Sequence, residues 1–268
     1  MNAKPCAILT RPADASHRLE RILKLADWPV LACPTLSIST CDPVRQAFDG
    51  LLDVDLVFFV SGAAVRAFAE QLERLKIAMP TQVAVAAVGK TTADEITRMF
   101  GRAEVIKPAP GDTEDSESLW KALLSRSSLP KRVLIVRGQD GRDWFADQLR
   151  QNGSSVTFHA AYCRSHATWP EATVFKLKSM ADVRAPAIWV CSSGEGIIAL
   201  ARLARLHGLY PWIKSCQFVV SHDRHVHALA MALSMDEKQK NTQIQVSNIE
   251  DNAILSSIES WVASSSFD

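Results

Sequence analysis

The sequence predicts an α/β protein with two similar domains, and three observations carry this prediction. Short apolar runs alternate with amphipathic helical patterns along all 268 residues. The order of these strand–helix units repeats once along the chain. Polar stretches that contain proline interrupt each half near its middle. Alternation of strands and helices is typical of parallel sheets that helices cover on both faces.

Six strand–turn–helix units account for the alternation. Each begins with an apolar run that ends in small or basic residues, and each continues with apolar residues spaced for one buried helix face. In the first half the strand-and-turn runs are residues 7–12, 56–62 and 85–90, and the helices are 13–26, 63–75 and 91–101. In the second half the runs are 133–139, 187–194 and 217–222, and the helices are 140–153, 195–208 and 223–233.

The six units are two copies of one three-unit pattern. Arg137 follows Arg11 by as many residues as Val156 follows Val30. The later units of each half, FVSG and CSSG, then VGK and VSH, repeat with a second constant spacing. A constant offset across several units indicates an internal duplication.

Linker-like stretches lie inside each half rather than between the halves. SISTCDP and CRSHATWPEAT are polar and contain proline. Cutting the chain there predicts an inserted domain over 41–163, a discontinuous domain from 1–36 and 168–268, and linkers at 37–40 and 164–167. The expected architecture is two flavodoxin-like domains joined by a two-crossing linker, with a cleft between them. Small-molecule sites often form in such clefts.

Composition excludes several classes of function. The residues are 47% hydrophobic and 22% charged, as in a globular protein. A net charge of +1 gives no general reason to bind nucleic acid or an anionic membrane. There is no run of about 18 apolar residues and no signal-peptide core at the N-terminus. Without such segments we expect a cytoplasmic protein. No exposed apolar stripe suggests an obligate partner chain, so we also expect a monomer.

Metal-binding patterns are weak. The six cysteines include no CxxC pair, and such scattered spacing does not indicate zinc. His222, His225 and His227 lie close together, but no acidic or cysteine ligand pattern accompanies them. The sequence therefore predicts no metal site.

Small and basic residues gather where the predicted strands end. In a parallel sheet, ligands bind at the carboxyl ends of the strands, where helix N-termini offer free backbone N–H groups. This pattern predicts a site for a ligand with many carboxylates or phosphates, although the same residue types also serve as ordinary caps and turns. The candidate binding residues are Arg11, Ser61, Gly62, Lys90, Thr92, Arg137, Ser193, Gly194, Ser221 and Arg224.

Tyr162 is the candidate catalytic residue. It ends the strand VTFHAAY where the chain leaves the inserted domain, which places a phenol at the expected mouth of the cleft. A phenol is protonated at neutral pH and suits a general acid better than a base. A structural tyrosine at a domain rim is the equally open alternative.

Seven stretches carry a resemblance to a known family. They are ILTRPADASHRL, VFFVSGAAVRAF, AVGKTTADEI, LIVRGQDGRDWFADQLRQNG, AAYCR, IWVCSSGEGI and VVSHDRHVHALA. In their order and spacing over nearly the whole chain they resemble uroporphyrinogen-III synthase, a cytosolic enzyme family of tetrapyrrole biosynthesis.

The resemblance implies a hydro-lyase reaction. The linear tetrapyrrole hydroxymethylbilane would lose water and close to uroporphyrinogen III with its last pyrrole ring inverted. No metal or organic cofactor is implied. The partner would be this small molecule, and a transient contact with the preceding pathway enzyme is a further hypothesis.

The resemblance also suggests roles for particular residues. Tyr162 takes the place of the tyrosine proposed to assist departure of the hydroxyl. Thr92 and Ser61 match family positions at the ends of two strands. The second turn departs from the family pattern, because Ser221, His222, Asp223 and Arg224 stand where many members have glycine and threonines.

Two other functions stay open. A non-catalytic cleft protein that binds a polycarboxylate metabolite would share every helix-terminus feature. A nucleotide-dependent transferase would use Gly89, Lys90 and Thr91 as a P-loop, but the glycine that this loop needs is replaced by Ala84.

Overall fold

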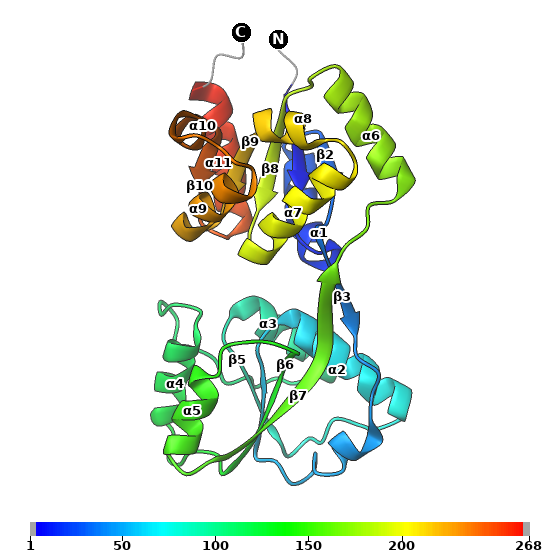
Figure 1. The fold of residues 1–268 in the computed structure, drawn as a ribbon. Coiled ribbons are helices and arrows are strands. Elements are labelled where there is room, and N and C mark those ends of the chain that lie inside the picture. The colour runs from blue at the N-terminus through cyan, green and yellow to red at the C-terminus, as the bar shows by residue number, and fades with distance from the viewer. Residues whose placement is uncertain (1–3, 265–268) are drawn as a thin grey trace. The chain divides into compact units, whose positions relative to one another are not determined.

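The structure, a computed structural model, describes residues 4–264. The chain divides into two compact units, one comprising Met1–Ser37 and Ser165–Asp268 and the other Ile38–Arg164. Each unit has a five-stranded sheet with helices on both faces (Figure 1). Residues 1–3 and 265–268, which belong to the predicted discontinuous domain, lie outside the described residues.

The first unit contains the two ends of the described chain. Its sheet has the order β10-β9-β8-β1-β2, and the paired strands are parallel. The N-terminal elements are β1 (Cys6–Leu9), α1 (Ala13–Leu25) and β2 (Val30–Ala32). The later elements are α6 (Glu171–Asp182), β8 (Ala187–Cys191), α7 (Gly194–Leu206), α8 (Tyr210–Ser215), β9 (Gln217–Val220), α9 (Asp223–Ala232), α10 (Glu237–Gln243), β10 (Ile244–Val246) and α11 (Asp251–Ser264).

The second unit has the sheet order β3-β7-β6-β4-β5. Strands β3 (Leu36–Thr40) and β7 (Ser155–His166) carry the chain from one unit to the other. Between them lie η1 (Arg45–Phe48), β4 (Leu56–Phe59), α2 (Gly62–Leu75), β5 (Ala84–Ala87), α3 (Lys90–Phe100), α4 (Ser116–Leu124), β6 (Arg132–Gly138) and α5 (Trp144–Gln151).

Alternation of side chains along each central strand builds two hydrophobic layers per sheet. In β4, Val57 and Phe59 join one cluster with α2 and α3, whereas Leu56 and Phe58 join another with α4 and α5. In β8, Trp189 packs toward α7 while Ile188 and Val190 pack toward α1 and α11. Burial on both faces explains why these strands are apolar without interruption. The prediction of an α/β fold with two sheets is confirmed, and the sheets are mainly parallel; β3 is the exception, since its ends pair antiparallel with β7.

Several boundaries and elements differ from the predicted pattern. The helix expected over 140–153 begins only at Trp144, because residues 139–143 form an irregular connection after β6. The six-unit pattern did not include α4, α6, α10 and α11. These helices do not follow directly on one of the six apolar runs used to find the units.

Phe68 tests the packing of the second unit. Its side chain is 0% exposed and its ring lies 5.4 Å from Phe48, 5.6 Å from Phe59 and 5.3 Å from His159 between centroids. We expect Phe68→Ala to lower the free energy of unfolding by about 3–5 kcal/mol through the cavity it leaves. Urea unfolding followed by circular dichroism measures this. Phe175→Ala, at a position 75% exposed, is the control, and equal effects of the two would contradict the packing described.

Candidate active site

The carboxyl ends of three strands line up along one edge of the second unit. Because β4 pairs in parallel with β5 and β6, Phe59 lies opposite both Ala87 and Val136. The residues that follow therefore reach the same edge. Ser61 is the N-cap of α2, and its Oγ accepts a hydrogen bond from the Ala64 N–H at 3.2 Å. This bond satisfies one of the first-turn donors and leaves others at the helix start.

Tyr162 lies beside this edge but is buried. Gly138 pairs with Tyr162 across an irregular step of the β6–β7 register. The phenol ring packs on Gly138 so closely that an added Cβ there would lie 3.0 Å from the ring. The hydroxyl oxygen lies 3.5 Å from Ser61 Oγ and accepts a hydrogen bond from Arg164 Nη2 at 3.4 Å.

The burial of this ring corrects the expectation of a phenol at an open rim. The side chain is 2% exposed and belongs to the hydrophobic cluster of the second unit. Because residue 138 is a glycine, the Tyr162 ring has room to pack over the sheet and is buried there. The hydroxyl has polar neighbours in Ser61 and Arg164, and the Arg164 guanidinium also lies 5.8 Å from the centre of the ring. Any acid chemistry of this residue takes place at the hydroxyl oxygen.

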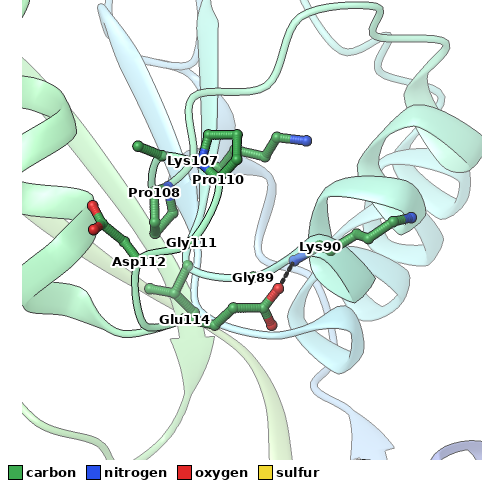
Figure 2. Close-up of a pocket in the computed structure, with 10 residues that line it drawn as sticks. Gly89, Lys90, Lys107, Pro108, Pro110, Gly111, Asp112 and Glu114 are labelled. Atoms are coloured by element: carbon green, nitrogen blue, oxygen red, sulfur yellow. Dashed lines mark hydrogen bonds between the residues drawn. The ribbon is translucent and has the colours of Figure 1, made fainter.

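A carboxylate of the protein occupies the start of α3. The Lys90 backbone N–H donates to Glu114 Oε1 at 2.7 Å, and an added Cβ on Gly89 would lie 2.3 Å from Glu114 Oε2 (Figure 2). The Lys90 ammonium donates to Asp94 Oδ2 at 2.6 Å, one turn along the same helix. Thr92 is buried. The helix start predicted to bind a ligand anion thus already holds an anion from its own chain.

A pocket of about 250 Å³ opens beside this contact. It lies entirely within the second unit, between the start of α3 and the segment that leads to α4 (Figure 2). Its lining residues are Val88, Gly89, Lys90, Lys107, Pro108, Ala109, Pro110, Gly111, Asp112 and Glu114.

The two duplicated arginines are held by internal partners. Arg11 Nη1 donates to Asp251 Oδ1 at 2.8 Å, and Nη2 donates to the Ile249 carbonyl at 2.8 Å. Arg137 Nη1 donates to Asp143 Oδ1 at 2.6 Å, and its guanidinium lies 4.0 Å from the centre of the Phe158 ring. Their side chains are 10% and 14% exposed. The predicted role of both as cations for a ligand is therefore opposed by ion pairs in this structure.

The first unit presents a second edge of the same design. Ser193 is the N-cap of α7, and its Oγ accepts from the Gly196 N–H at 3.1 Å. Gly194 opens the helix with nothing within 4 Å of an added Cβ. Because Cys191 pairs with Val220, the turn after β9 lies beside this helix start.

The turn after β9 is held by local hydrogen bonds. Ser221 Oγ donates to the Ser192 carbonyl at 3.2 Å and lies 3.3 Å from His225 Nδ1. The Arg224 N–H donates to His222 Nδ1 at 3.1 Å, so the histidine ring caps α9. Burial lowers the pKa of His225, and the nearby Arg224 and His222 lower it further. These effects favour the neutral form of His225.

Within the part of the chain that the structure describes, no group of three or more histidine, cysteine or acidic side chains could hold a metal ion. Of the histidines near the start of α9, His222 caps the helix and the buried His225 lies beside Ser221.

Sequence reasoning missed two features of these edges. Glu114 lies 24 residues beyond Lys90, in a loop with no recognisable motif. Arg66 on α2 donates to Glu95 on α3 at 3.2 Å, which ties together the two helices that start at this edge. The Arg98 and Arg66 guanidiniums lower the pKa of Glu95. Acidic and basic residues alternate so often in this sequence that nothing marks these pairs.

The comparison with protein families decides the identity. The family model described as "Uroporphyrinogen-III synthase HemD" matches residues 17–234. The chain belongs to the uroporphyrinogen-III synthase family. The resemblance seen in the sequence is thus confirmed, and with it the expectation of an enzyme, since this family consists of cyclising lyases of heme biosynthesis.

Named relatives agree with the family model. The uroporphyrinogen-III synthase of Escherichia coli K12 is 28% identical over 222 residues, covering 81% of this chain and 87% of the relative. That of Salmonella typhimurium LT2 is 27% identical over 231 residues, covering 82% and 88%.

Solved structures of uroporphyrinogen-III synthases share the fold. The Helicobacter pylori protein matches with a TM-score of 0.59 at 15% identity, over 96% of this chain and 99% of that one. A mutant Thermus thermophilus protein matches with a TM-score of 0.54 at 12% identity, over 97% and 100%. Of the helices described for this synthase-family chain, none has the length and apolarity to cross a bilayer.

The contact at α3 can be tested by removing its acceptor. We expect Glu114→Ala to lower the free energy of unfolding by about 0.3–1 kcal/mol, as loss of an exposed carboxylate at a helix N-terminus does. Hydrogen exchange at the Lys90 amide should also accelerate, because this N–H loses its partner. Asp112→Ala removes a carboxylate of the same loop that does not accept from Lys90, and it is the matched control. Unchanged exchange at Lys90 in Glu114→Ala would contradict the contact.

Proposed function

We propose that this enzyme cyclises hydroxymethylbilane to uroporphyrinogen III, with loss of water and inversion of the last pyrrole ring. The single observation that carries the proposal is the family match over residues 17–234. The two capped helix starts described above support it, because the substrate bears acetate and propionate arms and helix N-termini attract carboxylates.

Backbone donors account for substrate binding in this proposal. In the second unit Ser61 and Gly62 open α2, and in the first unit Ser193 and Gly194 open α7. The start of α7 is open, since nothing lies within 4 Å of an added Cβ on Gly194, whereas Arg66 Nη1 lies 3.3 Å from an added Cβ on Gly62 at the start of α2. Ser221 and Arg224 would add donors beside α7, whereas Arg11 and Arg137 would keep the edges in shape through their ion pairs.

Tyr162 would assist departure of the substrate hydroxyl. Arg164 donates to the phenol oxygen, so the phenol hydrogen is free to point to another acceptor. Protonation of the leaving hydroxyl would produce water and an azafulvene cation. Attack on this cation through a spiro intermediate would invert the last ring. Positioning of the two reacting carbons would lower the activation barrier further, since correct orientation alone is worth several kcal/mol.

Lys90 and Thr92 would act at α3 only after a change of partner. Glu114 accepts from the Lys90 N–H, so a substrate carboxylate at this helix start would have to displace it. We infer that the enzyme works without a metal or organic cofactor, as a cytoplasmic monomer, with at most a transient contact to the preceding pathway enzyme. The hydropathy pattern supports the cytoplasmic monomer, and the net charge of +1 gives no general reason to bind nucleic acid or an anionic membrane.

The reaction is tested by the isomer formed. Hydroxymethylbilane is generated in situ, the protein is added, and the oxidised porphyrins are separated. We expect isomer III to dominate, because closure without the enzyme leads to isomer I. Isomer I alone, from protein shown to be folded, would contradict the synthase proposal and favour a cleft protein that only binds a polycarboxylate.

The role of Tyr162 is tested by Tyr162→Phe, which removes only the hydroxyl. Loss of a general acid typically lowers turnover by about 10²–10⁴-fold, and we expect a decrease in this range with little change in the unfolding midpoint. Tyr210→Phe is the matched control, because that ring packs under the Arg205 guanidinium at 4.4 Å in the first unit. Wild-type turnover in Tyr162→Phe would remove this residue from the mechanism.

A further inference from the structure

Cys41 and Cys163 lie near the first and last residues of the second unit, on neighbouring chain segments. The Cys41 N–H donates to the Ala161 carbonyl at 2.9 Å, and Ser39 Oγ lies 3.1 Å from Cys163 Sγ. These contacts pair position 41 with 161 and position 39 with 163, so the neighbouring strands β3 and β7 run antiparallel here. Cys41 and Cys163 are therefore diagonal neighbours on one face of the pair.

The two thiols are close enough to interact. The Cys163 thiol lies near enough to Cys41 to raise the pKa of the Cys41 thiol. Both residues are partly exposed, so a small reagent can reach them. The enzyme reaction proposed above uses neither thiol.

The other cysteines are poorly placed for the same chemistry. Cys33, Cys191 and Cys216 are buried, and burial raises the pKa of each thiol to about 12. Since the thiolate is the reacting form, these three are inert at neutral pH. Cys6 is partly buried, and burial raises its pKa as well.

We propose that Cys41 and Cys163 form a reversible intramolecular disulfide, which makes this pair a redox modification site. A small disulfide of the glutathione type supplies the oxidising equivalents. One protein thiolate attacks the small disulfide, forms a mixed disulfide and releases one small thiol. The second protein thiolate then attacks the protein sulfur of the mixed disulfide and releases the other small thiol. One small disulfide is reduced to two thiols as two protein thiols become one disulfide.

The sheet geometry allows this bond to close. β3 is the edge strand of its sheet and pairs with β7 on one side only, so a shift of its end breaks no pairing with a second strand. Gln71 on α2 donates to the Cys41 carbonyl at 2.9 Å and would have to follow the shift. Diagonal neighbours start at about 7–8 Å, whereas the Cβ atoms of a disulfide lie about 4 Å apart, so closing the bond requires the end of the edge strand to move toward β7.

The bond would join the two ends of one folding unit. Cys41 and Cys163 lie near the limits of the unit Ile38–Arg164, so the closed loop contains nearly all of it. A crosslink around so long a loop restricts the unfolded chain and should stabilise this unit against unfolding.

The rate of formation should rise with pH. Burial raises the pKa of Cys41, and the neighbouring Cys163 raises it further. A thiol with a raised pKa is protonated at neutral pH and gains thiolate only as the pH rises above the usual range. We therefore expect disulfide formation to accelerate from pH 7 through pH 9.

The test uses the full chain with oxidised glutathione as the probe. Peptide mapping without reductant should show a linked pair of peptides that contain Cys41 and Cys163, with a loss of two thiols that dithiothreitol reverses. Cys163→Ser and Cys41→Ser should each lose the link, whereas Cys6→Ser, the matched control, should keep it. The oxidised wild type should unfold at a higher urea concentration than the reduced protein, and Cys163→Ser should show no such difference.

Three results would overturn the proposal. They are full retention of free thiols in the wild type, a link that maps to another pair such as Cys6 with Cys33, and glutathione adducts on Cys41 and Cys163 without a link between them. None of these results bears on the synthase reaction, whose test is the porphyrin isomer.

Discussion

The parallel register within each sheet is the constraint on which the site depends. When strands run the same way, the helices that follow them must all start at the same edge, so their N–H groups and dipoles add there. Because the chain is duplicated, each unit has an edge of this kind. Ser61 in one unit and Ser193 in the other are both N-caps after a central strand, and each accepts from the N–H three residues on. The attraction for anions at these edges therefore follows from the direction of the strands and does not depend on a particular side chain.

The attraction for anions at these edges comes from the backbone more than from free cations. Arg11 and Arg137, equivalent positions of the duplication, each pair with an aspartate at the start of a helix, Asp251 in α11 and Asp143 before α5. In each pair the arginine binds an aspartate of its own chain and links a strand end to a helix start, so its charge is not free for a ligand. An edge of this kind would hold a flexible polycarboxylate through many weak contacts, which would suit the proposed substrate.

Local pattern was sufficient for the sheets but insufficient for the contacts that finish the site. Apolar runs and repeated turns predicted the parallel strands and the helices that follow them. The partner of Arg11 lies 240 residues away, and no local spacing reveals such a pair. The burial of Tyr162 depends on an irregular register step opposite Gly138, a property of two paired strands. Helices such as α6, with Leu177 as the buried residue on its face, carry too weak a pattern to be found.

Glu114 changes what the start of α3 can contribute. A carboxylate at a helix N-terminus is worth about 0.3–1 kcal/mol when exposed. Here that interaction is already made within the protein. A substrate carboxylate that binds there exchanges one anion for another, so the free energy of the exchange is small. Gly194 at the start of α7 has no such occupant within 4 Å of its added Cβ, and a carboxylate bound there would add its full interaction. In this synthase-family chain, α7 is therefore suited to affinity, whereas α3 is suited to ordering its own loop until a substrate arm competes for it.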